Sequence, residues 1–143
     1  MKRAKWRKDD CMTRKAFDTR DGAFTEFSLW LRNQRELDSS LGYVATNVDF
    51  VWHNYKTGKW MLIEEKRYGG HVTRSQKGMF NILTRACSLD RNYCGFFLIV
   101  FSETSPDDGE IRINGIRATV EELFDLLRFD RDAICRYSGN ALT

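Results

Sequence analysis

Proline is nearly absent from this chain, and so are long apolar runs. The single proline among 143 residues argues against long disordered segments away from the termini. No stretch approaches the roughly 18 consecutive apolar residues of a membrane span, so we expect no membrane partner. The first residues are charged and lack the apolar segment of a secretory signal, which favours a cytoplasmic location.

Close cysteine spacings are also missing. The four cysteines are Cys11, Cys87, Cys94 and Cys135, and no two of them stand at the short intervals of a zinc or iron–sulphur motif. A disulfide framework does not fit a cytoplasmic protein. We therefore expect four reduced thiols and no cysteine-held metal.

The length and apolar content suit a single domain. A chain of 143 residues that is 42% hydrophobic can bury one sizeable core. Residues 1–15 are rich in Lys and Arg, and we treat them as a basic N-terminal arm, with residues 16–143 as the domain. The arm has two interpretations: it neutralises phosphates, or it is a solvated terminus. The net charge of +3 neither requires nor excludes nucleic acid.

Two strands joined by a turn form the centre of the sequence. Residues 48–52 are β-branched and aromatic residues bounded by polar ones, and residues 60–66 form a second run of strand type. Residues 54–58 supply turn chemistry, with Gly58 suited to a positive φ. We expect a β-hairpin.

Charged residues interrupt both strands of this hairpin. Side chains alternate along a strand, so Glu64 and Lys66 share one face while Glu65 projects from the other. In a hairpin Asp49 can lie beside Glu64. Two adjacent carboxylates are costly unless a cation offsets their charge, which a divalent metal does well. The alternative is a solvent-exposed charged edge with weak ion pairs.

The flanking segments predict helices and a further strand. Residues 23–37 have apolar residues at helical spacing, with Glu26 beside the apolar stripe or, alternatively, as an ordinary first-turn acid. Residues 43–47 are expected to open the sheet. After a flexible connection at Gly69–Gly70, a helix is expected from about residue 73 or 75 to residue 88, with Gln76 in its first turn. Positive charge from Arg67, Arg74 and Lys77 surrounds this corner, as a nucleic-acid site would need.

The rest of the chain reads as a sheet core and a helix. Residues 93–102 form a continuous apolar run, typical of a central strand buried on both faces, so helices must cover both sides. Residues 111–113 fit a short edge strand, and Asn114–Gly115 fits a tight turn. Thr119 and Glu122 form a capping box for a helix over residues 120–128. Residues 131–143 carry little signal.

The order of these residues resembles the PD-(D/E)XK nucleases, the restriction-endonuclease-like superfamily. Asp49, a turn, an apolar run and then Glu64 and Lys66 match its motif. Glu26 is similar to the acidic residue that many members carry on the first core helix. Gln76, followed four residues later by an aromatic residue, is similar to the glutamine of the RecB-like exonucleases. The likeness covers about residues 21–102, and Val48 stands where the family motif has proline.

The resemblance implies both a fold and a reaction. The fold is α/β, a single domain with an αβββαβ core and a central mixed sheet flanked by helices. The reaction is Mg²⁺-dependent hydrolysis of DNA, with Mn²⁺ as a substitute. Asp49, Glu64 and Glu26 bind the metal, Lys66 activates water or stabilises the transition state, and Gln76 orients substrate or Lys66.

The biological setting stays open at this point. Small stand-alone relatives include Holliday-junction resolvases, which act as dimers, and virus-encoded nucleases, for which the location is the host cytoplasm. A homodimer is therefore one option, and both endonuclease and exonuclease activity fit. The alternatives are a nuclease directed at RNA, a non-catalytic nucleic-acid-binding module with the same fold, and an interaction protein whose charges only decorate its surface.

Overall fold

The computed structural model describes residues 25–138, in two compact units that meet between Asn47 and Val48. The first unit contains helix α2 (Glu26–Arg32) and two 3₁₀ turns, η1 (Arg35–Leu37) and η2 (Ser39–Leu41). The Thr25 hydroxyl accepts a hydrogen bond from Ser28 N at 3.1 Å and so begins α2. The basic arm at residues 1–15, and its boundary with the domain, lie outside the described residues.

Helix α2 is shorter than the sequence predicted. It ends at Arg32 rather than near residue 37. The Gln34 side chain donates to the Trp30 carbonyl at 3.0 Å, which takes the acceptor that the next helical turn would have used. Gln34 itself has extended backbone angles, so the helical path stops there.

The prediction that residues 43–47 open the sheet is wrong, because residues 43–48 contain neither helix nor strand. Tyr43 and Val44 have high β propensity, yet their side chains are 57% and 61% exposed. Propensity without a bonded neighbour and a buried face does not make a strand. The first strand therefore begins at Phe50, and the described residues have two strands before the helix Arg74–Cys87, where the αβββαβ order has three.

The second unit is an α/β structure around an open, mixed sheet of five strands, in the order β1-β2-β3-β4-β5. Strand β2 runs antiparallel to β1 and parallel to β3, and the last two pairings are antiparallel. The predicted hairpin and the central position of β3 are confirmed. The bounds are β1 (Phe50–His53), β2 (Trp60–Lys66), β3 (Tyr93–Phe101), β4 (Ile111–Ile113) and β5 (Ile116–Ala118).

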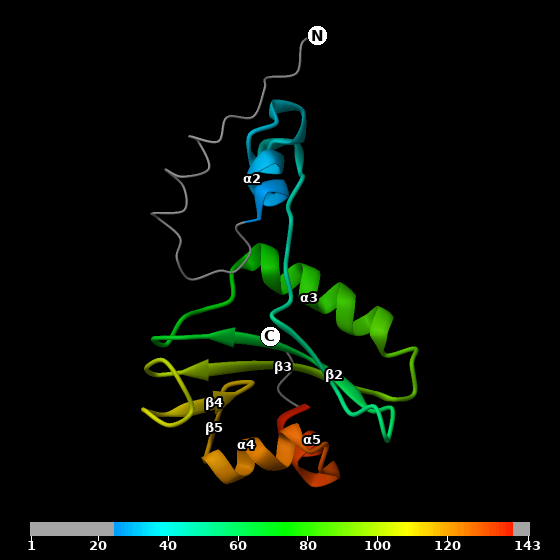
Figure 1. Cartoon of the computed structure of the whole chain (residues 1–143), viewed down its shortest axis with the longest axis vertical. Coiled ribbons are helices and arrows are strands. Elements are labelled where there is room, and N and C mark those ends of the chain that lie inside the picture. The colour runs from blue at the N-terminus through cyan, green and yellow to red at the C-terminus, as the bar shows by residue number, and fades with distance from the viewer. Residues whose placement is uncertain (1–24, 139–143) are drawn as a thin grey trace. The chain divides into compact units, whose positions relative to one another are not determined.

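Helices cover both faces of the sheet, as predicted. Figure 1 shows α3 (Arg74–Cys87) on one face and α4 (Val120–Leu127) and α5 (Arg131–Ser138) on the other. Leu62, Phe80 and Phe96 form the core under α3. A larger cluster, which includes Met61, Ile63, Phe97 and Tyr137, lies under α4 and α5. Within residues 25–138 no helix is both long and apolar enough to cross a membrane.

Two assignments at the C-terminal side need correction. Strand β4 is not the edge strand, because β5 pairs with it, and Ile111 and Ile113 are almost fully buried. The tight turn at Asn114–Gly115 is confirmed, with φ of 47° and 82°. Helix α5 was not predicted at all, although its Tyr137 is fully buried.

Candidate functional site

Strand β2 carries Glu64 and Lys66 to one face of the sheet. Leu62 packs in the core under α3, whereas Met61 and Ile63 pack in the core under α4 and α5. By this alternation Glu64 and Lys66 face the α3 layer. Glu65 belongs to the other face, where its carboxylate pairs with Arg67 Nε at 3.0 Å. Glu64 and Glu65 therefore lie on opposite faces of the sheet, as predicted.

Asp49 lies immediately before β1, beside Glu64. The register pairs Phe50 with Ile63, which brings Asp49 opposite Glu64. Asp49 Oδ2 accepts a hydrogen bond from the Glu65 backbone N–H at 2.8 Å, and this contact anchors its carboxylate to β2. The expected pairing of the two carboxylates across the hairpin is thus reproduced, with Asp49 in a bend rather than inside the strand.

Glu64 is the most unusual residue of the site, because it is only 3% exposed. Its Oε1 lies 3.2 Å from Lys66 Nζ, whereas its buried Oε2 has no hydrogen-bond partner among the described residues. Burial, and after it the charge of Asp49, raise the pKa of Glu64 to about 7, against the opposing effect of Lys66. A buried carboxylate oxygen without a partner is a group that a cation can satisfy.

Lys66 is held between two elements. Its Nζ also donates to Gln76 Oε1 at 3.4 Å. Gln76 Oε1 accepts from the Thr73 backbone N–H at 3.1 Å, and the Thr73 hydroxyl accepts from Gln76 N at 3.1 Å, which forms a capping box at the start of α3. The same amide oxygen therefore begins the helix and locates the lysine. Thr73 was not predicted as part of this network, although the Thr-x-x-Gln spacing signals it.

The connection between β2 and α3, which the sequence predicted to be flexible, is held by backbone hydrogen bonds. Tyr68 N and Gly69 N donate to the carbonyls of Glu103 and Phe101, and Tyr68 and Gly69 both have positive φ. A Cβ on Gly70 would lie 3.1 Å from the Arg67 carbonyl oxygen and 3.4 Å from Lys66 Cβ. A glycine at position 70 thus lets the turn close tightly behind Lys66.

The other predicted site residues are placed differently. Glu26 is an exposed first-turn residue of α2, in the first unit. Arg67 bonds Glu65 and does not join the group around Lys66. Arg74 and Lys77 lie in the first turn of α3, near Gln76, where the sequence placed them.

The described residues offer a metal two carboxylates. Among residues 25–138 there is no group of three or more His, Cys, Asp or Glu side chains that would bind a metal. Mg²⁺ keeps several of its waters and needs only one or two carboxylates, so Asp49 and Glu64 fit that chemistry. A cavity of about 260 Å³ beside Thr84, Tyr93 and Ser138 does not include Asp49, Glu64 or Lys66.

Comparison with known proteins does not assign the chain to a family. No family model matches the chain, and neither a curated protein nor a solved structure matches it. The site is therefore interpreted from its own residues.

Proposed function

We propose that the protein is a metal-dependent nuclease of the PD-(D/E)XK type that hydrolyses phosphodiester bonds of DNA. The observation that carries the proposal is Glu64: a buried carboxylate with one unpartnered oxygen, beside Asp49, with Lys66 Nζ 3.2 Å from its other oxygen. Such an arrangement costs stability in the free protein. A cation bound between the two carboxylates would offset that cost.

Asp49 and Glu64 are the residues that would hold the cation. Asp49 keeps Oδ1 available, since Oδ2 is bonded to the Glu65 backbone, and Glu64 keeps Oε2. A bound Mg²⁺ supplies positive charge against the phosphate and acidifies a bound water. Glu26, which the resemblance names as a further ligand, belongs to the first unit, so the proposed site rests on Asp49 and Glu64.

Lys66 is the residue proposed to act on the reacting groups. Its ammonium positions the attacking water or stabilises the negative charge that develops on the phosphate oxygens, and in its neutral amine form the same group would take the proton of that water. Gln76 limits where the ammonium can lie, because the capping box holds its side-chain oxygen in place. Arg74 and Lys77 lie in the same helical turn and attract the polyanion.

The order of elements also supports the proposal. Along the chain a helix is followed by an antiparallel hairpin, a second helix and a parallel strand. Asp49 immediately precedes the first strand of the hairpin, and Glu64 and Lys66 lie on its second strand. This succession agrees with the superfamily core except that the described residues have two strands, not three, before α3. Strand β3, parallel to β2 and reached through α3, fits the last strand of that core.

The test is cleavage of end-labelled single-stranded, duplex, flapped and four-way-junction DNA, and of the matching RNA, with Mg²⁺, Mn²⁺ or EDTA. We expect metal-dependent cutting by the wild type. Lys66→Ala should lower it by at least about a hundredfold while the fold and metal binding are retained. Glu65→Ala is the matched control and should cut like the wild type, since Glu65 lies on the opposite face. Full cutting by Lys66→Ala, or none by a folded Glu65→Ala, would contradict the proposal.

A second candidate is a non-catalytic nucleic-acid-binding module with the same fold. The observation that favours it is that Lys66 Nζ lies 3.2 Å from Glu64 Oε1, so this carboxylate already has one cation beside it without a metal. In that case the wild type binds nucleic acid and cuts none of the substrates with any metal. Cutting of RNA alone would instead assign an RNA-directed nuclease.

A further inference from the structure

The hairpin between β1 and β2 ends in a rigid turn that presents an aromatic side chain to solvent. Tyr55 is 83% exposed at its tip. Asn54 holds the turn closed: its side chain accepts from Lys56 N at 2.9 Å, its backbone carbonyl accepts from Gly58 N at 2.8 Å, and its own N–H donates to the Lys59 carbonyl at 2.9 Å. These bonds hold the backbone of the turn, and an aromatic side chain, which has only two rotatable bonds, loses little entropy when a flat partner stacks on it.

Positively charged residues lie in and next to this turn. Lys56 and Lys59 follow Tyr55 in the hairpin turn, and Arg91 belongs to the connection between α3 and β3. That connection lies against the hairpin, because Trp60 N donates to the Asn92 carbonyl at 3.1 Å, and Figure 1 shows both loops at the same end of the sheet. Within residues 25–138 none of the three cations forms an ion pair. The carboxylate of the neighbouring Asp90 is bonded to Asn92 N.

Strand β1 connects this tip to the candidate site. Asp49, Val51 and His53 share one face by strand alternation, and all four residues of β1 are exposed. Glu64 and Lys59 are five residues apart on the paired strand, which corresponds to about 17 Å at the usual rise per residue. A stacked nucleic-acid strand advances about 3.4 Å per nucleotide, so roughly five nucleotides cover that distance.

We propose that the tip formed by Tyr55, Lys56, Lys59 and Arg91 is a second contact for single-stranded nucleic acid. Tyr55 stacks on an unpaired base while the cations neutralise the adjacent phosphates. The strand runs along β1, and the phosphate to be cut lies at Asp49 and Glu64. This inference rests on the proposed function, and it names the substrate feature that the enzyme recognises: an unpaired segment of about five nucleotides next to the cleaved bond.

The experiment is binding of fluorescent oligothymidylate and oligouridylate of increasing length, in EDTA so that no cutting occurs. For the wild type, affinity should rise steeply once the oligonucleotide exceeds about five nucleotides. Tyr55→Ala should bind the long oligonucleotides roughly tenfold more weakly and the shortest ones as the wild type does. Removal of both lysines, Lys56→Ala with Lys59→Ala, should lower the slope of log affinity against log salt by about 1.4.

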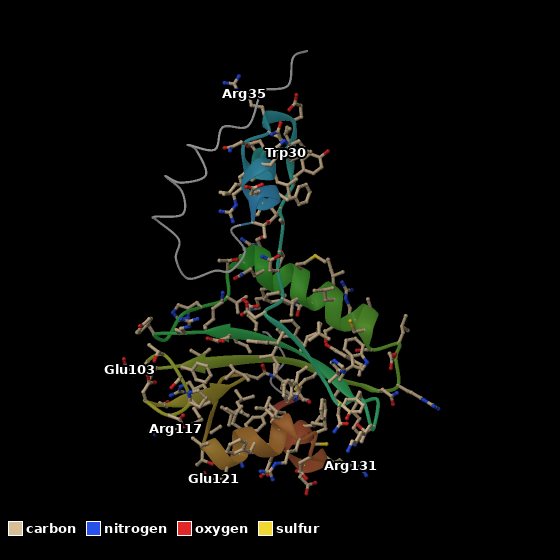
Figure 2. The ribbon with its side chains drawn as sticks, viewed as in Figure 1. Trp30, Arg35, Glu103, Arg117, Glu121 and Arg131 are labelled. Carbon is tan, nitrogen blue, oxygen red and sulfur yellow. The ribbon has the colours of Figure 1, made fainter. Side chains whose placement is uncertain are left out.

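Matched controls come from the opposite layer. Phe124 is an exposed aromatic residue of α4. Arg131, which Figure 2 labels, is an exposed cation at the start of α5. Phe124→Ala and Arg131→Ala should bind like the wild type. The two oligonucleotide series show whether the site prefers DNA or RNA, and circular dichroism checks that each variant is folded.

The outcomes separate this inference from the proposed function. If the wild type cuts DNA but Tyr55→Ala binds every length equally well, the tip is not a contact and the nuclease proposal stands. If the wild type neither cuts nor binds any oligonucleotide, both proposals fail. Tyr55-dependent binding to anionic lipid vesicles, without any effect on oligonucleotides, would overturn the inference in favour of a membrane surface.

Discussion

At the scale of single residues, the state of Glu64 decides how the site behaves. Its pKa in the folded protein is about 7, against 4.5 for an unperturbed glutamate. The folded state therefore binds more protons than the unfolded state between these two values. Stability therefore falls with rising pH: the contribution of Glu64 is most favourable below about pH 4.5 and is lost as the pH rises through about 7.

Replacement of Glu64 tests this directly. We expect the melting temperature of the wild type in EDTA to fall between about pH 5 and about pH 8. In Glu64→Gln this fall should be smaller, because the amide does not ionise. Addition of Mg²⁺ at about pH 8 should stabilise the wild type and leave Glu64→Gln unchanged. Thermal melts of both proteins over this range provide the measurement. Identical pH slopes in the two proteins would show that Glu64 is not the group responsible.

The residues of this site were predictable where strand periodicity governs them. Alternation along β2 separates Glu64 and Lys66 from Glu65, and the hairpin brings Asp49 to Glu64. The partners of long side chains were not predictable. Arg67, which the sequence placed among the cations around Gln76, instead pairs with Glu65. Such choices depend on rotamers and on distances between elements, which sequence spacing does not specify.

At the scale of elements, the start of α3 combines helix capping with the geometry of the site. Thr73→Ala removes the hydroxyl that accepts from Gln76 N and should lower the free energy of unfolding by about 1 kcal/mol. Gln76 would still bond Lys66, so cleavage by the folded variant should be kept. Gln76→Ala removes the contact with Lys66 as well and should reduce cleavage by at least about tenfold. Urea unfolding together with initial cleavage rates separates the two effects.

The comparison of these two variants isolates positioning from stability. If Thr73→Ala and Gln76→Ala lose stability and cleavage in proportion, Gln76 acts only as a cap. Gln76→Glu offers a further check, because a carboxylate keeps the capping acceptor and pairs more strongly with Lys66. A changed dependence of the cleavage rate on pH in that variant is the signature of a residue that acts on the lysine.

Elements with strong local signals were predicted well. Strand β2 and helices α3 and α4 match the structure to within about two residues, because apolar runs and the Thr73 and Thr119 capping boxes mark their limits. The segment at residues 43–47 has the composition of a strand but no bonded neighbour among the described residues. Tertiary pairing, which composition does not encode, decides such cases.

At the scale of the second unit, a few polar contacts hold α4 and α5 to the sheet and to each other. Trp52 Nε1 on β1 donates to the Leu127 carbonyl at the end of α4, at 2.8 Å. Tyr137 of α5 is fully buried, and its hydroxyl donates to Glu122 of α4 at 3.1 Å. Helix α5 could not be predicted from its own eight residues, because its burial comes from β3 and α4 rather than from a long apolar stripe.

Asn114 is the residue on which this assembly depends most. It is only 7% exposed. The side-chain oxygen accepts from Leu98 N at 2.8 Å, and the side-chain nitrogen donates to the carbonyls of Phe96 at 3.3 Å and Tyr137 at 3.1 Å. Asn114 thus links β3, the β4–β5 turn and α5. Its φ of 47° is also one that asparagine tolerates better than alanine. Asn114→Ala would leave three backbone groups without their side-chain partner.

We therefore expect Asn114→Ala to lower the free energy of unfolding by about 3 kcal/mol or more, measured by urea unfolding. Asn81→Ala, at an exposed position of α3, is the matched control and should change it by less than about 0.5 kcal/mol. Asn114 is far along the chain from Asp49 and Glu64 and touches neither, so the folded fraction of Asn114→Ala should still respond to Mg²⁺. Loss of the Mg²⁺ response in a variant that remains folded would mean that the site depends on the α5 side of the sheet.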